Sequence, residues 1–116
     1  MPQITVDYSA ELGDAFGRRD FALALHPLVA KTIDTSVPAC KTRFRAVEES
    51  VVGDEPAGAA IVHITIGMLA GRTPEVKAEL TRAVVELLED HVRPVGGVRV
   101  HASAEVRDLD PSYDKN

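Results

Sequence analysis

The sequence predicts an α/β protein in which two β-α-β units build a four-stranded mixed sheet with two helices on one face. Four segments alternate apolar and polar residues with a period of two, which is typical of strands. Two other segments repeat apolar residues at helical spacing, and each lies between two of these strands. A helix that connects two strands favours parallel pairing through a right-handed crossover, so each unit is expected to pair its own strands in parallel.

The bulk composition favours one globular domain spanning 1–116, because a chain of 116 residues lies within the usual size of a single domain. A net charge of −5 disfavours nucleic-acid binding, and no metal-ligand spacing occurs. The single cysteine, Cys40, excludes an internal disulfide and suits a reducing compartment. The first residues are unlike a signal peptide and no apolar run could span a membrane, so a cytoplasmic location is expected.

The first unit opens with a strand over 3–9, QITVDYS, which continues into a polar connection over 11–19. Pro2 directly precedes this strand, and a proline inside a chain suits the first strand position because it has no backbone N–H. The apolar face of the strand consists of Ile4, Val6 and Tyr8.

A helix is expected over 21–35, with Asp20 as its N-cap. Pro27 lies inside this segment, where it removes one backbone hydrogen bond and crowds the carbonyl of Leu23. We therefore expect a kink at Pro27, or a helix that starts again at His26-Pro27. The helical face toward the core would contain Phe21, Leu25, Leu28, Val29 and Ile33.

A second strand is expected over 40–52, and the turn GDEPAG at 53–58 follows it. The second unit begins with the clearest strand, AIVHITIGML at 60–69. The core face of this strand would contain Val62, Ile64, Ile66 and Met68.

The second helix is expected to begin after Thr73, a good N-cap, with Pro74 in the first helical position. Its apolar stripe continues to about Val92. A last strand over 98–106 follows, and residues 108–116 are expected to form a loosely ordered tail.

Two helices can cover only one face of a four-stranded sheet. The uncovered face still carries apolar residues such as Ile61 and Leu69. A second surface is needed to cover them, which predicts self-association.

Several short motifs occur together in one order along nearly the whole chain. They are MP at the start, Pro27, PACKTRFR at 38–45, VHIT at 62–65, AGRT at 70–73 and the late Pro111. With the repeated strand–helix–strand pattern, the sequence resembles the tautomerase superfamily, and within it most of all the 5-carboxymethyl-2-hydroxymuconate isomerases. The resemblance implies a homotrimer with active sites near subunit boundaries and no cofactor. It also implies that Pro2 is the catalytic base and that Arg43 and Arg72 bind carboxylates of the substrate.

The chemistry of Pro2 depends on removal of Met1, because only a terminal proline carries a basic secondary amine. An α-amino group titrates near ~8, and both burial and neighbouring guanidinium groups would lower that pKa toward neutral pH. Arg43 and Arg72 can each grip a carboxylate through two parallel hydrogen bonds. Arg72 also lies just ahead of a helix N-terminus, which favours anions.

Structural roles compete with these functional ones. Arg43 and Arg45 could both be solvated or subunit-bridging strand charges, and this interpretation is preferred for Arg45. Arg72 could pair with Glu75, and a strand histidine such as His63 is more often structural than catalytic. No ligand spacing or base partner is evident for His26, His91, His101 and Cys40.

Three functions remain open from the sequence. The first is a trimeric tautomerase that isomerises a carboxylated dienol or enol, as in the breakdown of aromatic acids, with a small dicarboxylate as substrate. The second is a non-catalytic small-molecule binding or regulatory domain of ferredoxin-like topology. The third is a tautomerase-fold protein whose task is interaction and whose enol–keto activity is incidental.

Overall fold

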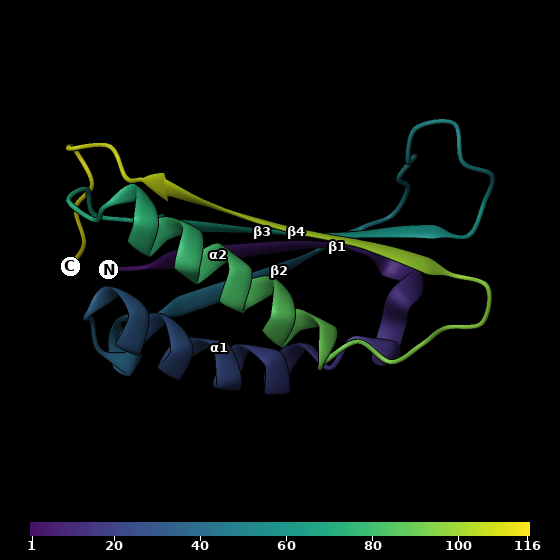
Figure 1. The fold of residues 1–116 in the computed structure, drawn as a ribbon, viewed down its shortest axis with the longest axis horizontal. Coiled ribbons are helices and arrows are strands. Elements are labelled where there is room, and N and C mark those ends of the chain that lie inside the picture. Colours follow the sequence, from purple (N-terminus) through teal and green to yellow (C-terminus); the bar gives the residue numbers. More distant parts are fainter.

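A computed structural model describes residues 1–116 and contains one four-stranded sheet in the order β2-β1-β3-β4. The strands are β1 (Gln3–Ser9), β2 (Lys41–Val47), β3 (Ala59–Met68) and β4 (Arg99–Asp108). β1 pairs with β2 in parallel and β3 pairs with β4 in parallel, whereas β1 and β3 join the two units antiparallel. Both helices, α1 (Arg18–Ile33) and α2 (Pro74–Glu89), lie on one side of the sheet (Figure 1). The predicted fold class is confirmed.

The core lies between the two central strands and the helices. The even-numbered side chains of β1 and β3 face α1 and α2 and are buried, as the period of two predicts. The helical stripes supply the opposite wall. The side chains with no measurable exposure include Ile4, Val6, Phe21, Leu25, Val29, Ile64, Ile66, Leu80 and Val84.

The connection between β1 and α1 differs from the polar loop that the sequence predicts. A short 3-10 helix, η1 (Ala10–Ala15), occupies it, and both Leu12 and Phe16 are buried in the core. The Phe16 ring meets the ring of Tyr8 edge-on, with centroids 5.6 Å apart. Two isolated apolar residues in so short a segment leave no periodic pattern, which is why the sequence does not reveal this role.

Helix α1 begins at Arg18 rather than after Asp20, and Gly17 is its N-cap residue. Asp20 lies in the first turn, where its charge still favours the positive end of the helix dipole. The helix continues through Pro27 without starting again. Both Pro27 and Leu23 are exposed, so water can solvate the Leu23 carbonyl that loses its partner.

The second strand is shorter than the predicted 40–52. β2 ends at Val47, which pairs with Ser9, the last residue of β1. Because β2 is an edge strand whose only neighbour is β1, it has no further partner beyond that pair. Residues 48–58 form a loop instead, and positive φ angles at Gly53 (51°) and Gly58 (111°) turn the chain there.

The second unit follows its predicted signals closely. Thr73 caps α2, its hydroxyl oxygen accepting a hydrogen bond from the Val76 amide at 3.2 Å, and Pro74 takes the first helical position. The helix ends at Glu89, three residues before the expected end at Val92. Neither 16-residue helix combines the length and apolar character that crossing a membrane requires.

The face of the sheet turned away from the helices is more polar than expected. Ile61 lies there and Leu69 is exposed just beyond β3. Register and alternation place mainly polar and charged side chains around Ile61: Gln3, Thr5, Asp7, Arg43, Arg45, His63, Thr65, His101, Ser103, Glu105 and Arg107. We call this the open face. Apolar burial alone is therefore a weak reason for self-association through it.

Candidate active site

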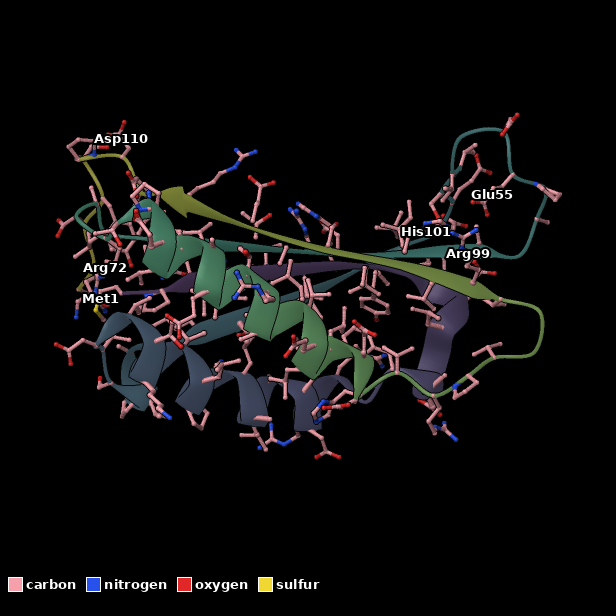
Figure 2. The ribbon with its side chains drawn as sticks, viewed as in Figure 1. Met1, Glu55, Arg72, Arg99, His101 and Asp110 are labelled. Atoms are coloured by element: carbon pink, nitrogen blue, oxygen red, sulfur yellow. The ribbon has the colours of Figure 1, made fainter.

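The start of the chain is built into one end of the sheet. Pro2 directly precedes β1 and is buried, continuing the alternation of Ile4 and Val6. The backbone amide of Lys41 donates a hydrogen bond to the Pro2 carbonyl at 3.2 Å. Figure 2 shows Met1 next to Arg72, which precedes α2 at the same end of the molecule. The structure thus places Arg72 close to the start of the chain.

The terminal amine lies in surroundings that favour its neutral form. Burial lowers the pKa of the Met1 amine below its ordinary value, and the charge of Arg72 lowers it further. Lys115 and Lys41 contribute in the same direction, whereas Cys40 opposes them. An amine at this position is therefore a free base at lower pH than an ordinary α-amino group.

Arg72 connects two elements through backbone carbonyls. Its Nη2 donates to the carbonyl of Ile33 at 2.8 Å, and its Nη1 donates to the carbonyl of Leu69 at 3.2 Å. Ile33 is the last residue of α1, so the guanidinium also faces the negative end of that helix dipole. The alternative partner, Glu75, does not pair with Arg72. A surface hollow of about 400 Å³ lies beside Arg72, between Asp34 and Thr73.

Arg43 lies on the open face, away from the buried side on which Pro2 packs. Its Nη2 donates to the Gln3 side-chain oxygen at 2.6 Å, and its Nη1 lies 3.5 Å from the Thr5 hydroxyl. Thr5 is its register partner across the parallel pair, so the guanidinium leans along β1 toward the start of the chain. Within one chain, Arg43 and Arg72 therefore reach the N-terminal end from different sides of the sheet.

Arg45 and His63 contact other side chains of the open face. Arg45 forms a two-pronged ion pair with Asp7, at 2.7 Å and 3.1 Å. His63 lies 2.6 Å from the Ser103 hydroxyl and 2.9 Å from the Glu105 carboxylate. Hydrogen bonds from Arg107 and then His63 lower the pKa of Glu105.

The remaining thiol and imidazole groups also have structural surroundings. Burial raises the pKa of the Cys40 thiol and lowers the pKa of His26, whose Nε2 lies 2.8 Å from the Thr42 hydroxyl. His91 Nδ1 donates to the Leu87 carbonyl at 2.8 Å. His101 lies 3.3 Å from Glu55, at ion-pair distance but without an aligned hydrogen bond. No group of three or more metal-ligating side chains comes together.

Two further features of this end are evident only in the structure. The side-chain amide of Gln3 donates to the Tyr113 hydroxyl at 3.0 Å, which ties the end of the chain to its beginning. Lys115 and Lys41 add positive charge near the terminal amine. Parallel pairing of 3–9 with the strand that contains Lys41 could have suggested the lysine, whereas no pattern marks the residues of the tail.

Other hollows lie elsewhere on the surface. A groove of about 660 Å³ follows α1 and the edge of β2, and it contains Arg18, His26 and Phe44. Another, of about 350 Å³, lies under the loop at 48–58, at the end of the sheet remote from Met1 (Figure 2). Neither includes an amine with a lowered pKa beside a guanidinium. The N-terminal end is the better candidate because it combines a base with cations.

Comparisons with known proteins identify the family of this chain. A model of the family described as 5-carboxymethyl-2-hydroxymuconate isomerase matches residues 2–116. A search of curated proteins finds no match.

Several solved structures share the fold. A 5-carboxymethyl-2-hydroxymuconate isomerase from Deinococcus radiodurans R1 has a TM-score of 0.79 at 24% identity, over 99% of this chain and 89% of that one. A 5-carboxymethyl-2-hydroxymuconate delta-isomerase has a TM-score of 0.83 at 13% identity, over 100% and 87%. A fused 4-OT wild type symmetric trimer has a TM-score of 0.76 at 21% identity, over 97% and 91%.

The contacts of Arg72 predict a contribution to stability. Arg72→Ala removes two charge-assisted hydrogen bonds to carbonyls, so the free energy of unfolding is expected to fall by about 1–3 kcal/mol. Urea unfolding followed by circular dichroism at one protein concentration measures it. The control is Arg82→Ala, because Arg82 is exposed on α2 and should change stability little. Equal midpoints for the two variants would contradict this role.

Proposed function

Because this chain belongs to the 5-carboxymethyl-2-hydroxymuconate isomerase family of the tautomerase superfamily, we propose that it isomerises a carboxylated dienol or enol with the Pro2 amine as general base. The proposed substrate is 5-carboxymethyl-2-hydroxymuconate, and the proposed setting is the cytoplasmic breakdown of aromatic acids. The observation that carries this proposal is the lowered pKa of the terminal amine beside Arg72. Membership of an isomerase family favours catalysis over the non-catalytic binding domain that the topology alone would allow.

The proposed base forms when Met1 is removed. The amide nitrogen of Pro2 then becomes a secondary amine, one residue further into the surroundings that lower the pKa of the Met1 amine. Burial of Pro2 and the charge of Arg72 disfavour the protonated amine, so it can accept a proton near neutral pH. The amine takes a proton from one atom of the conjugated system and returns it to another. Atoms and charge balance without a further reactant.

In the proposed mechanism, the two arginines bind and stabilise the negative charge of the substrate. Tautomerisation develops negative charge on the substrate oxygen, and a guanidinium nearby stabilises that charge while it grips a carboxylate. Arg72 is close to the amine within one chain, whereas Arg43 lies exposed on the open face of edge strand β2. A homotrimer with sites at subunit boundaries would let Arg43 of one chain serve the amine of its neighbour.

Removal of Met1 is expected to switch the activity on. Protein that starts at Pro2 should turn over a carboxylated dienol, and kcat/KM should rise with pH as the amine loses its proton. Because the amine pKa is lowered, the midpoint of that rise should fall below about 8. Intact mass identifies the processed form, and a pH–rate profile gives the midpoint. A Met1-retaining form of equal activity would disprove the mechanism.

Loss of a carboxylate-binding arginine should lower catalytic efficiency on a dicarboxylate. Arg43→Ala is expected to reduce kcat/KM by roughly tenfold to a hundredfold, the value of a hydrogen bond to a charged group. Arg72→Ala should do the same, and Arg72→Lys should recover part because lysine lacks the two-pronged geometry. The kcat/KM for a mono-acid substrate that lacks the bound carboxylate should hardly change when the arginine that holds this carboxylate is replaced.

Arg45→Ala is the matched control for Arg43→Ala. Arg45 lies on the same strand and the same face, but its guanidinium is paired with Asp7. Arg45→Ala should therefore lower kcat/KM much less than Arg43→Ala does, provided that the oligomeric state is unchanged. A dicarboxylate turnover within about twofold of wild type in Arg43→Ala would remove Arg43 from the proposed site.

The proposed assembly has a direct test in solution. Sedimentation equilibrium at micromolar protein is expected to give three times the chain mass of 12.5 kDa. The unpaired edges of β2 and β4 offer backbone groups for contacts between subunits. A stable and active monomer would count decisively against the homotrimer.

A further inference from the structure

The C-terminal segment that follows β4 is anchored across the open face at the N-terminal end of the sheet. The amide of Leu109 donates to the Met68 carbonyl at 2.8 Å. The Leu109 side chain lies over Gly67, where an added Cβ would come within 2.8 Å of Leu109 Cδ2. Gly67 is buried although it belongs to the open face, because this segment covers it. The glycine therefore makes room for the returning chain.

A turn then directs the chain back toward β1. The Asp110 carboxylate accepts a hydrogen bond from the Ser112 amide at 2.9 Å, and the Asp110 carbonyl accepts one from the Tyr113 amide at 2.9 Å. The contacts with Ser112 also lower the pKa of the Asp110 carboxyl. The turn brings the Tyr113 hydroxyl to the side chain of Gln3, next to Pro2 in the sequence.

Gln3 joins the tail to Arg43. A guanidinium can only donate, so the Gln3 oxygen must face Arg43, whose Nη2 lies 2.6 Å away. The amide nitrogen of Gln3 then points the other way and donates to the Tyr113 hydroxyl at 3.0 Å. Tyr113, Gln3 and Arg43 form one chain of hydrogen bonds in which each partner fixes the orientation of the next.

This chain of contacts decides where the Arg43 guanidinium lies. Its register partner is Thr5, yet its shorter hydrogen bond is to Gln3, two residues closer to Pro2. Most of its N–H donors remain free for an anion. An exposed arginine without such contacts would have to be ordered when the ligand binds, which weakens binding.

We propose that Gln3 and Tyr113 are positioning residues that hold the Arg43 guanidinium ready for a substrate carboxylate, so that the C-terminal tail is part of the substrate site. The inference rests on the proposed function, in which Arg43 binds a carboxylate. Lys115, two residues beyond Tyr113, adds positive charge near the terminal amine of its own chain.

The test is a double-mutant cycle on the processed, full-length protein with a dicarboxylate substrate. Tyr113→Phe removes only the hydroxyl and should raise KM by about three- to tenfold, the value of one neutral hydrogen bond, with kcat within about twofold. In an Arg43→Ala background the same change should have no further effect, because the residue that it positions is gone. Gln3→Leu should resemble Tyr113→Phe, because it removes the link between Tyr113 and Arg43.

Tyr8→Phe is the matched control, because it removes the other tyrosine hydroxyl of the chain, which bonds to no other side chain, and leaves the ring in the core. It should leave KM unchanged. Calorimetric binding of a non-reacting dicarboxylate gives a second readout, and sedimentation and urea midpoints verify the assembly and fold of each variant.

The outcomes separate this inference from the proposed function. An unchanged KM in Tyr113→Phe, or an equal rise with and without Arg43, overturns the positioning role while Arg43→Ala alone still reports carboxylate binding. If Arg43→Ala leaves kcat/KM for the dicarboxylate unchanged, Arg43 does not bind the substrate. The proposed role of Arg43 and the present inference are then both wrong. A KM effect that appears only when Arg43 is present supports the inference.

Discussion

The double pairing of β1 is the constraint on which the rest of the structure depends. β1 forms a parallel ladder with β2 on one side and an antiparallel ladder with β3 on the other, and it begins directly after Pro2. A chain terminus usually moves freely, but here the first residues are tied to a central strand. The ladders therefore set the position of the terminal amine relative to the loop before α2. A base at the start of the chain is useful only with such an anchor, because proton transfer requires a defined geometry.

In the proposed function, the same cations would serve two chemical needs at this end of the molecule. The chain as a whole is acidic, with a net charge of −5, so the overall field does not attract an anionic substrate. Arg72, Lys41 and Lys115 nevertheless lie near the terminal amine and lower its pKa. Groups that keep the amine neutral are also groups that a carboxylate would contact. Local concentration of positive charge would thus allow the proposed anion site in a protein that is acidic as a whole.

The sheet separates the candidate residues by face. Pro2 belongs to the buried side of the sheet and Arg43 to the open face. Arg72 reaches the amine from the helical layer while it also holds the carbonyl at the end of α1. A site that uses both arginines therefore needs either a partner chain or the end of the sheet, where the two faces meet.

Local patterns in the sequence determined most of the fold. The period of two located β1 and β3, and the Thr73-Pro74 cap located the start of α2, because alternation and capping depend on near neighbours along the chain. The motifs at Pro2, Arg43 and Arg72 likewise suggested the candidate site residues. Tertiary structure alone decided that β2 stops at Val47, where its only partner ends.

Tertiary structure also decided the contacts that surround the candidate site. Arg72 bonds to the carbonyl of Ile33, and Gln3 bonds both to Arg43 and, across 110 positions of sequence, to Tyr113. No local propensity encodes such pairs, because each side chain is compatible with many neighbours until the sheet and the helices have packed. The sequence thus supplied the chemical groups, and the packing of distant segments supplied their orientation.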